Sequence, residues 1–490
     1  MRLAIALAFA DASVAVLALP QIVVRLHTTI SHVTWVITAY NLALIAGTLA
    51  VLPLARALAS RRALVAGLAV FGLASLGSGA AGSLTLLIVW RCLQGAGGAL
   101  LLCASLPLIG ARDSAGALRS WAAAAAVGAA VGPAAGGLLT QIFDWRAIFF
   151  AQAPIAALAI ITALSAPSAP SVPRDPSRDE ATSSAPPPDP APTGVASLPG
   201  LSPGSANLGL GLISAGLIGA LFIASVLLIN VWQVSPLGAA AILAVIPIAT
   251  VLTERMAATR RAALTGPAGA LVLALGLVGL ALISHRALVP AVLALALCGV
   301  GLGLAFPSLT RVALSTRGTP VARAARTVAA REGGLVLGLV LLTSILVSQL
   351  NDAPARATQP IIQAIVVAPQ LSLPQKFALG TGLQAASAHA PESRLPDIGP
   401  AFARVATGAS PAGQAELAAL RPRIQTLIER AATRSFRTPL LLCALLSLLA
   451  TLALLVAVAI TYVLGRRGTG RDEDDRGSPA STTPGHRSLP

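Results

Sequence analysis

The chain contains 490 residues, of which 56% are hydrophobic and 11% are charged, and its mean hydropathy is +0.81. Soluble domains average about a quarter charged residues, so this composition excludes an ordinary soluble domain. The net charge of +16 could indicate a nucleic-acid partner. In so apolar a chain, however, the basic excess of cytoplasmic loops is the better explanation, and we expect no nucleic acid.

Apolar runs of about 20 residues recur along the chain, each long enough to cross a hydrocarbon core of ~30 Å as a helix. Barrel strands would instead alternate in segments of about ten residues. We therefore predict an all-α membrane protein with twelve transmembrane helices in two six-helix bundles. The predicted spans are 3–24, 34–54, 63–82, 84–108, 118–141 and 147–165 in the first half, and 208–231, 236–254, 266–284, 287–309, 328–349 and 438–464 in the second.

The predicted bundles are joined by a linker and followed by a tail. Residues 1–165 form the first bundle, and 166–206, rich in Pro, Ser and Ala, form a flexible cytoplasmic linker. Residues 207–465 form the second bundle, which includes a long extracytoplasmic loop at 351–436. The charged segment 466–490 is expected to be a disordered cytoplasmic tail.

The distribution of arginines predicts the orientation of the chain. Arginines gather after the second, fourth, eighth, tenth and twelfth spans, whereas the opposite short loops hold little more than Arg25, Arg146 and Arg286. Cytoplasmic loops carry such a basic excess. We therefore expect both termini and the linker in the cytoplasm, and residues 351–436 outside.

The N-terminal stretch "MRLAIALAFADASVA" (1–15) has features of a signal peptide: one basic residue, an apolar run and small residues. Asp11 interrupts this run, and the apolar segment continues to Val24. We therefore interpret it as the first span, with the true start of the protein at Met1 or a little upstream.

The sequence contains no pattern typical of a metal site or an enzyme. Cys92, Cys103, Cys298 and Cys443 all lie in predicted helices without metal-ligand spacing. The glycine-rich "GVGLG" (299–303) also lies within a span, where glycines allow close packing of helices. We expect no catalytic residues, no metal and no bound cofactor.

Polar residues within the spans are the most informative part of the sequence. Asp11 is the acidic residue that we place within a span, roughly 12 Å deep at 1.5 Å per residue. Arg91, in "LLIVWRCLQGAGGALLL" (86–102), is the arginine that we place similarly deep. A charge at such depth costs roughly 2.5 to 3.5 kcal/mol on insertion scales, so we expect both side chains to face the bundle interior. A polar contact that only locks helices together is the alternative.

Five motifs follow one another in the first half, and two looser ones lie in the second. They are "DASVAVLALPQI" (11–22), "WVITAYNLALIAG" (35–47), "RCLQGAGGA" (91–99), "GAAVGPAAGG" (128–137), "WRAIFFAQAPIA" (145–156), "VSPLGAAAILAVIPIA" (234–249) and "GVGLGLAFPSLTRVALS" (299–315). Together they resemble the drug:proton antiporter branches of the major facilitator superfamily. The resemblance implies a two-bundle transporter in which Asp11 and Arg91 take part in proton coupling.

Two features depart from the family pattern. In the loop "LPLARALASRR" (52–62), Arg56 occupies the place of an acidic residue, while Arg61 and Arg62 are basic. Without that acid, the charge lock of the family cannot form in its usual way, which puts coupling or gating in doubt. The sequence also resembles the fourteen-helix branch most, yet the proline-rich linker stands where two further helices would lie.

The fifth span contains a glycine motif made of Gly128, Gly132, Pro133, Gly136 and Gly137. Glycines at four-residue intervals create a flat helix face that another helix can approach closely. The proline removes one backbone hydrogen bond and permits a kink. We expect this face to seal the exterior side while the halves move; tight packing without a gating role is the alternative.

A weak internal repeat links the two halves. "LQGAGGALLLCASLPLIG" (93–110) and "LCGVGLGLAFPSLTRVAL" (297–314) share glycine-rich starts and a later proline, and each lies in the fourth span of its bundle. Parallel repeats of this kind place the substrate near the membrane midplane, between the halves.

The sequence thus predicts a proton-coupled antiporter of the inner or plasma membrane that exports small amphiphilic compounds such as drugs or metabolites. The proton gradient would be its energy source, and its partners would be a small-molecule substrate and the lipid bilayer; we expect a monomer. Tyr40, Asn41, Gln94 and Asn230 are expected to line the substrate cavity. Because only 3% of residues are aromatic, a lipid-like or endogenous metabolite stays open as substrate. A facilitator without protons and a transporter-like scaffold that moves nothing are further alternatives.

The long outer segment has a helical pattern of its own. Apolar residues recur at helical spacing within "AELAALRPRIQTLIERAATRSF" (415–436), with Pro422 inside the pattern. We expect a partly helical cap that rests its apolar face on the outer ends of the bundle or on lipid headgroups. A poorly ordered insertion is the alternative.

Overall fold

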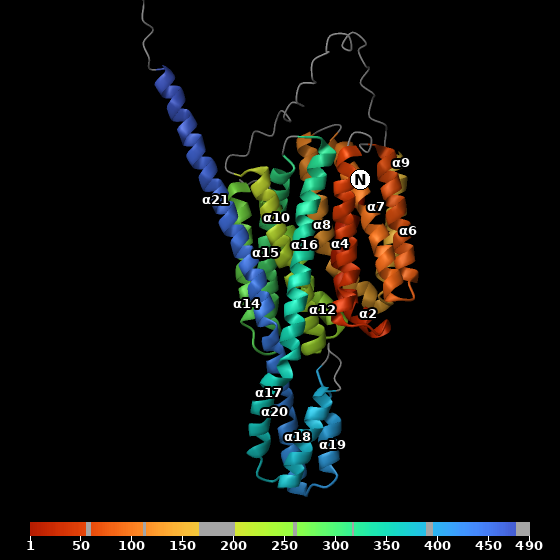
Figure 1. Ribbon diagram of the computed structural model, residues 1–490, viewed down its shortest axis with the longest axis vertical. Coiled ribbons are helices and arrows are strands. Elements are labelled where there is room, and N and C mark those ends of the chain that lie inside the picture. The colour runs from red at the N-terminus through yellow and green to blue at the C-terminus, as the bar shows by residue number, and fades with distance from the viewer. Residues whose placement is uncertain are drawn as a thin grey trace, which may run out of the picture.

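The computed structural model describes residues 1–54, 60–110, 114–165, 201–257, 262–315, 318–388 and 395–476. All the regular elements in these ranges are helical (Figure 1). Arg56, most of the predicted linker and the end of the predicted tail lie outside the described residues.

The first half forms a set of long helices joined by short connections. Its elements are α1 (Arg2–Val14), η1 (Ala15–Ala18), α2 (Leu19–Arg25), α3 (Ile30–Val33), α4 (Trp35–Val51), η2 (Leu52–Leu54), α6 (Arg61–Ala80), α7 (Leu84–Gly110), α8 (Ser114–Ile142) and α9 (Ala147–Ser165). The first predicted span is divided into three elements, and Pro20, which cannot donate a backbone hydrogen bond, lies at the start of the third. The Ser60 side chain caps α6 by accepting a hydrogen bond from the amide of Ala63.

The second half has the same general plan with more irregular helices. Its elements are α10 (Pro203–Ile218), η4 (Gly219–Ile223), α11 (Ala224–Val226), η5 (Leu227–Val231), α12 (Pro236–Leu243), α13 (Val245–Ala257), α14 (Ala262–Ala281), α15 (Leu288–Ala313), α16 (Pro320–Asn351) and α21 (Arg437–Arg476). Two boundaries differ from our prediction. The α10 helix begins at Pro203, inside the expected linker, and α21 continues to Arg476, so the first part of the expected disordered tail is helical.

Ten helical stretches in the described part of the chain are long and apolar enough to cross a membrane. The all-helical membrane architecture is therefore confirmed. Large apolar side chains such as Leu73, Leu264 and Val289 are exposed on these helices, as expected for faces that contact lipid rather than water. The predicted spans 3–24 and 118–141 are not among the ten, although both are helical and α1 packs against α8.

Small residues bring helix backbones together at matching places in the two halves. Gly95 of α7 lies against α4, and Gly299 of α15 lies against α13. Gly97 and Gly301 lie in the same way against α6 and α14. The repeat predicted from these two glycine-rich stretches is thus confirmed as an equivalent packing of the fourth long helix in each half.

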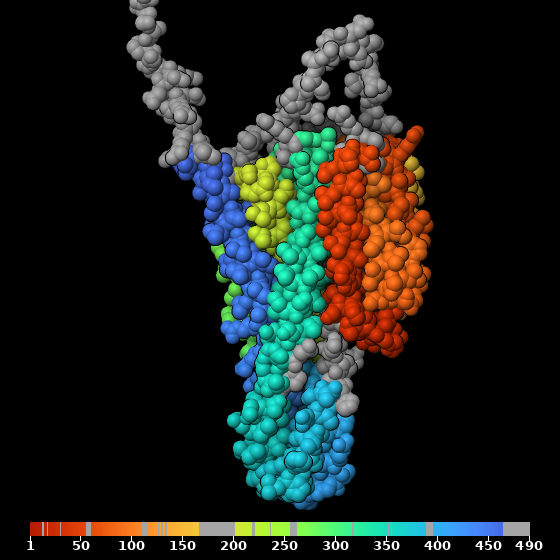
Figure 2. All heavy atoms as spheres, in the orientation of Figure 1, coloured from red at the N-terminus to blue at the C-terminus, as the bar shows by residue number. Residues whose placement is uncertain are grey.

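The two halves meet along two lines of helix contact. On one side α4 packs against α16, and Figure 2 shows these two helices side by side on the face toward the viewer. A small apolar cluster of Val51, Cys103, Val321 and Ala325 lies at this contact. On the other side α8 packs against α12, α13 and α15.

The described residues of 353–435 form a separate four-helix lobe beyond one end of the bundle (Figure 1). Its helices are α17 (Ala353–Val366), α18 (Leu373–Ala388), α19 (Gly399–Ala406) and α20 (Pro411–Ser435). The helix predicted at 415–436 is present as α20, but its apolar face does not rest on the bundle. Leu417, Leu420 and Ile424 are buried against the other helices of the lobe, which supply apolar faces of their own.

Candidate functional site

A fully buried polar cluster lies inside the first half, where α1, α6, α7 and α9 meet. Asp11 comes from α1, Arg91 and Gln94 come from α7, and all three are completely buried. Ser75 of α6 and Gln152 of α9 complete the cluster and are also buried. Because its members come from four different helices, the cluster can form only when the whole half is packed.

The centre of the cluster is an ion pair. The Arg91 Nη1 lies 2.6 Å from Asp11 Oδ2, and neither side chain is exposed. The Arg91 Nε also donates to the carbonyl oxygen of Val36 at 2.9 Å, and the guanidinium lies 4.3 Å from the centre of the Tyr40 ring and 5.5 Å from that of Phe149. A planar guanidinium can stack on rings and donate in its plane at the same time, which an ammonium cannot.

Two glutamines occupy the remaining carboxylate oxygen of Asp11. The side-chain nitrogens of Gln94 and Gln152 lie 3.0 and 2.8 Å from Asp11 Oδ1. The Gln94 oxygen accepts from Arg91 at 2.8 Å, and its nitrogen lies 2.8 Å from the Ser75 hydroxyl. Asp11 therefore has three donors on its two oxygens, which is a well-solvated environment for a buried carboxylate.

Tyr40 and Asn41 are both buried in α4, and Tyr40 contacts this cluster. Tyr40 stacks on Arg91 and donates its hydroxyl hydrogen to the carbonyl oxygen of Ala8 at 3.0 Å. Asn41 donates to the carbonyl oxygen of Ile37 in its own helix at 3.0 Å. Its Oδ1 is buried and has no hydrogen-bond partner among the described residues, and its place in a substrate cavity stays a prediction.

The family of the chain is decided by a profile match over most of its length. The profile of the Major Facilitator Superfamily matches residues 2–349. The chain belongs to the Major Facilitator Superfamily. The resemblance seen in the motifs is confirmed, and the family is one of transporters rather than enzymes. Together with the ten apolar helices, this membership makes the chain a multi-pass protein of the plasma membrane.

Several known relatives in the superfamily are drug-resistance proteins. The puromycin resistance protein pur8 of Streptomyces alboniger is 41% identical over 159 residues, which are 31% of this chain and 31% of the relative. The multidrug resistance protein Stp of Mycobacterium tuberculosis is 32% identical over 157 residues, 31% of this chain and 29% of the relative. The methylenomycin A resistance protein of Bacillus subtilis is 35% identical over 165 residues, 33% of this chain and 35% of the relative. The chain thus spans 29% to 35% of the length of these relatives.

Solved structures of superfamily transporters share the fold. A bacterial homologue of the human lysosomal transporter Spinster, inward-facing and occupied, has a TM-score of 0.56 at 17% identity and covers 93% of this chain and 95% of its own. A proton:xylose symporter bound to 6-bromo-6-deoxy-D-glucose has a TM-score of 0.53 at 13% identity, over 69% of this chain and 86% of its own. At such low identity these likenesses establish the fold alone.

The glycine motif of this superfamily member packs α8 against α1. The buried glycines of the motif are Gly128, Gly132, Gly136 and Gly137. A Cβ added at Gly128 would overlap the carbonyl of Ala6, and one added at Gly136 would overlap that of Val14. The α8 helix continues through Pro133. These contacts flank Asp11 on α1, so the motif fixes the helix that carries the acid; its role in sealing the exterior stays a prediction.

The remaining predicted residues lie outside the cluster. Asn230 belongs to η5 and is buried, close in sequence to Trp232, whose indole donates to Thr433 of the lobe at 3.1 Å. The described contacts do not bring Asn230 to Asp11, and its assignment to the substrate cavity stays a prediction. Arg61 donates to the carbonyl of Leu164 at 3.2 Å, and Arg62 is exposed.

Sequence reasoning missed four members of the buried polar set. Gln152 lies in the predicted span 147–165 and carried the same signal as Gln94, namely an amide in an apolar run. Ser75 carried no such signal, because serines are common in membrane helices. Arg331 and Glu332 are also buried, and our view of Asp11 as the acid within the spans was therefore wrong.

That error came from overlooking two charged residues inside a predicted span. We counted Arg331 with the cytoplasmic arginines after the tenth span, although Glu332 falls within the predicted span 328–349. In the structure α16 begins at Pro320, where the Thr319 side chain caps it, so both residues lie well within the helix.

Among the described residues no group of three or more His, Cys, Asp or Glu could hold a metal ion.

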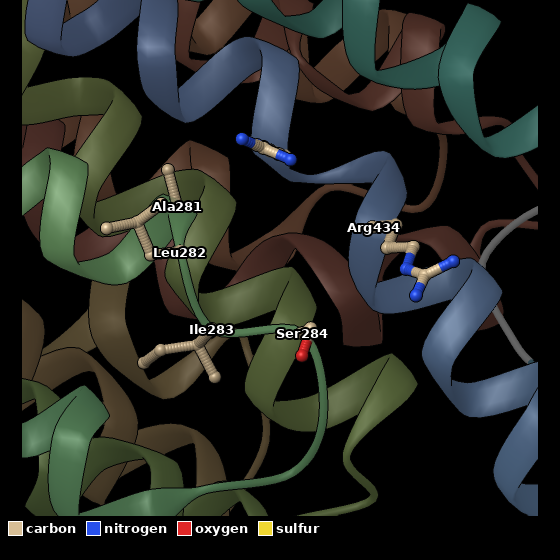
Figure 3. A pocket seen from close by; sticks show the side chains of 6 residues that line it. Ala281, Leu282, Ile283, Ser284 and Arg434 are labelled. Carbon is tan, nitrogen blue, oxygen red and sulfur yellow. The ribbon is translucent and has the colours of Figure 1, made fainter.

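A cavity of about 360 Å³ lies at the end of the bundle next to the lobe (Figure 3). Its lining residues are Ala281, Leu282, Ile283, Ser284, Arg434 and Arg437. It thus sits between the end of α14 and the junction of α20 and α21, and shares no residue with the buried cluster. We assign it no part in the chemistry of Asp11.

Proposed function

We propose that the protein is a proton-coupled antiporter that exports small amphiphilic compounds by alternating access. The observation that carries the proposal is the fully buried Asp11–Arg91 pair, with its 2.6 Å contact and its two glutamine partners. Ionisable residues within a membrane are costly and typically mark proton or ion pathways. A group that can lose and regain a proton at such a site is what coupling to the proton gradient requires.

The proposed coupling follows from the bonding of Asp11. While Asp11 is a carboxylate, Arg91 is held against it, against Val36 and over Tyr40. A proton on Asp11 would cancel the charge that holds the guanidinium and so loosen α1 from α7. Release of the proton on the cytoplasmic side would restore the pair. Alternation between these two packings could expose the substrate path to opposite sides of the membrane.

The proposed topology has twelve membrane-crossing helices in two bundles, one at 1–165 and one at 207–465. The helical stretches α1–α2 and α8 would add to the ten that are apolar enough to cross alone. In Figure 1 the N-terminus and the end of α21 lie at one end of the bundle and the lobe at the other. The arginine distribution supports a cytoplasmic position for the first of these ends and an outer position for the lobe.

The names of the relatives support drug-like export substrates for this chain. Resistance to puromycin, to methylenomycin A and to several drugs is stated for proteins that match about a third of its length. We extend that class to this protein as part of the proposal, with a monomer as the working unit.

The test is proton-driven transport by the full chain in lipid vesicles. Ethidium and puromycin serve as probes, and an imposed pH gradient should drive their movement against a concentration difference. The matched control is Asp352→Asn, which removes an acid that is 64% exposed at the end of α16 and should leave transport unchanged. Equal probe movement with and without the gradient would contradict proton coupling.

A non-transporting scaffold is the second candidate, and one observation favours it. Asp11 accepts three hydrogen bonds on its two oxygens, as a purely structural contact would. The same vesicle experiment separates the two candidates, because a scaffold would move neither probe under any gradient.

A further inference from the structure

We propose that Glu332 is a second proton-carrying carboxyl, set beside Arg331 in the second half, and that it has a free oxygen for a proton where Asp11 has not. The inference rests on the proposed proton-coupled transport and adds a residue to it. Nothing in the family match or in the sequence motifs points to this position.

The pair lies deep in a helix that belongs to a candidate membrane span. Arg331 and Glu332 are 6% and 3% exposed, and the stretch Pro320–Val366 is among the ten that could cross a membrane. Glu332 lies roughly 18 Å along α16 from Pro320 at 1.5 Å per residue. Neighbouring residues on a helix point in different directions, so this pair is not held together by helix geometry alone.

The bonding of this pair differs from that of the first pair. The Arg331 Nη1 lies 3.4 Å from Glu332 Oε1, which is a loose contact. Within the described part of the chain, Glu332 Oε2 and the Arg331 Nε and Nη1 atoms have no hydrogen-bond partner. Asp11, in contrast, receives three donors at 3.0 Å or less.

This difference decides which acid is open to a proton. A buried carboxylate oxygen without a donor is costly, and a proton bound to it removes the charge that makes it so. A proton that joins Asp11 must instead weaken bonds that already exist. The geometry therefore points to Glu332 as the free acceptor, and to Asp11 as the acid that must first be released.

The second pair also lies where the two halves meet, so its contacts depend on their relative position. The Arg331 guanidinium lies 4.1 Å from the centre of the Phe9 ring on α1 and 5.4 Å from that of Phe306 on α15. Phe9 precedes Asp11 by two residues on α1, and Glu332 lies within electrostatic range of Asp11, so the two pairs lie near each other at the boundary between the halves. Separation of α1 from α16 must break the contact between Arg331 and Phe9.

Among the described residues, few other charged or titratable groups lie within electrostatic range of Glu332. Electrostatic interactions reach Glu332 from Arg331 on its own helix and from Asp11 on α1. Tyr40 on α4 lies within electrostatic range of both pairs, including Arg91. The α10 and α15 helices, which also pack against α16, contribute neutral residues near the pair.

Each buried acid lies beside a close approach of two helix backbones in its own half. The α10 and α16 backbones touch at Gly211 and Gly334, two residues beyond Glu332. In the first half α1 and α8 touch at Gly128 and Gly136, on either side of Asp11. Each acid thus lies on a helix that packs closely against another helix of its own half. Each acid will therefore move together with its half when one half moves against the other.

The proton step itself is simple. The Glu332 carboxylate takes up one proton from the outer water when the halves open outward, and forms a neutral carboxyl beside Arg331. The carboxyl returns that proton to the cytoplasm when the halves open inward. No bond other than O–H forms or breaks, and no reagent other than water and the proton gradient is needed.

Infrared difference spectra of the full-length protein in lipid, between alkaline and acidic buffer, test the site without any substrate. The stretch of protonated carboxyls in the wild type should contain a component from the buried Glu332, beside those of Asp11 and the other acids, and this component should be absent in Glu332→Gln. It should persist in Glu332→Asp, which keeps the carboxyl, and in the exposed control Asp352→Asn. A spectrum of Glu332→Gln that equals the wild type would overturn the proposal, whether or not the protein proves to transport.

A vesicle measurement tests whether Glu332 carries a proton during transport. With ethidium as the probe, Glu332→Gln should lower the number of protons moved by about one per exported molecule, since one carboxyl is neutralised. An unchanged proton count in a transporting Glu332→Gln variant would overturn the inference while leaving proton-coupled export intact. Absence of proton-driven ethidium movement in the wild type would instead contradict the proposed function, and the infrared spectra would still decide the site.

Discussion

At the scale of single residues, the buried ion pair in the first half behaves as one unit. Asp11 and Arg91 are both completely buried, and each is the charge partner of the other. Removal of one partner from such a pair leaves an uncompensated charge, which costs about 3 to 5 kcal/mol, whereas neutral replacement of both is often tolerated. Loss of stability and loss of coupling can therefore be separated by experiment.

We predict that Asp11→Asn abolishes proton-driven export and also lowers stability, because Arg91 keeps its charge without a partner. The double variant Asp11→Asn with Arg91→Gln should recover most of the stability but none of the export. Thermal unfolding in detergent and vesicle transport measure the two effects. Export by Asp11→Asn at the wild-type rate would exclude Asp11 as a coupling residue.

Arg91→Lys keeps the charge but loses the planar fork. An ammonium cannot pair with Asp11, donate to Val36 and stack on Tyr40 in one geometry, so we predict partial activity and a smaller loss of stability than for Asp11→Asn. Initial export rates in vesicles and melting curves measure the change. Full activity would mean that the contact to Val36 and the ring stacking have no part in coupling.

Single residues could be predicted from the sequence where a polar group interrupts an apolar run. Asp11, Arg91 and Gln94 stood out for this reason, and the structure brings them together. Whether two such groups meet depends on the direction in which each helix face points, which a sequence without a known packing does not contain. The pairing of Gln152 with Asp11 was therefore not foreseen, and the place of Asn230 in a substrate cavity stays a prediction.

At the scale of helices, the sequence predicted the order of the apolar elements better than their ends. Helix α16 begins at Pro320 because Thr319 caps it, while the arginines that follow seemed to us part of a loop. Glu332 lay inside the predicted span 328–349 and was overlooked beside them. The π-helical elements η4 and η5 could not be foreseen, because their wider turns depend on packing against neighbouring helices.

The close contact of α1 and α8 gives a prediction at this scale. A methyl group at Gly136 would overlap the carbonyl of Val14, so Gly136→Ala should lower stability by about 1 to 3 kcal/mol and move α1 with Asp11. The matched control is Gly380→Ala in α18, where the added methyl meets open space. Alanine favours a helix by about 1 kcal/mol over glycine, so the control should be neutral or slightly stabilised. Equal melting temperatures for the two variants would contradict the close approach.

At the scale of the whole molecule, the bundle and the lobe have separate apolar cores. The core of the lobe is formed by α17, α18, α19 and α20 alone. Single hydrogen bonds tie the lobe to the bundle, among them that from the indole of Trp232 to Thr433. The sequence predicted helix in this segment but not the lobe, because only three-dimensional packing shows that its helices cover one another.

The last prediction follows from the place where the lobe leaves the bundle. The Ser435 hydroxyl donates to the carbonyl oxygen of Gln349 at 2.9 Å, so the end of α20 lies beside the end of α16. A short Gly/Ser connector in place of residues 353–434 can therefore bridge the two ends. We expect this variant to insert, to melt near the temperature of the wild-type bundle and to keep proton-driven ethidium export. The control is Gly408→Ala, where the added methyl group meets open space and the lobe stays in place. A deletion variant that fails to insert while the control inserts would show that the bundle depends on the lobe, and a changed export rate with normal insertion would place the lobe on the substrate path.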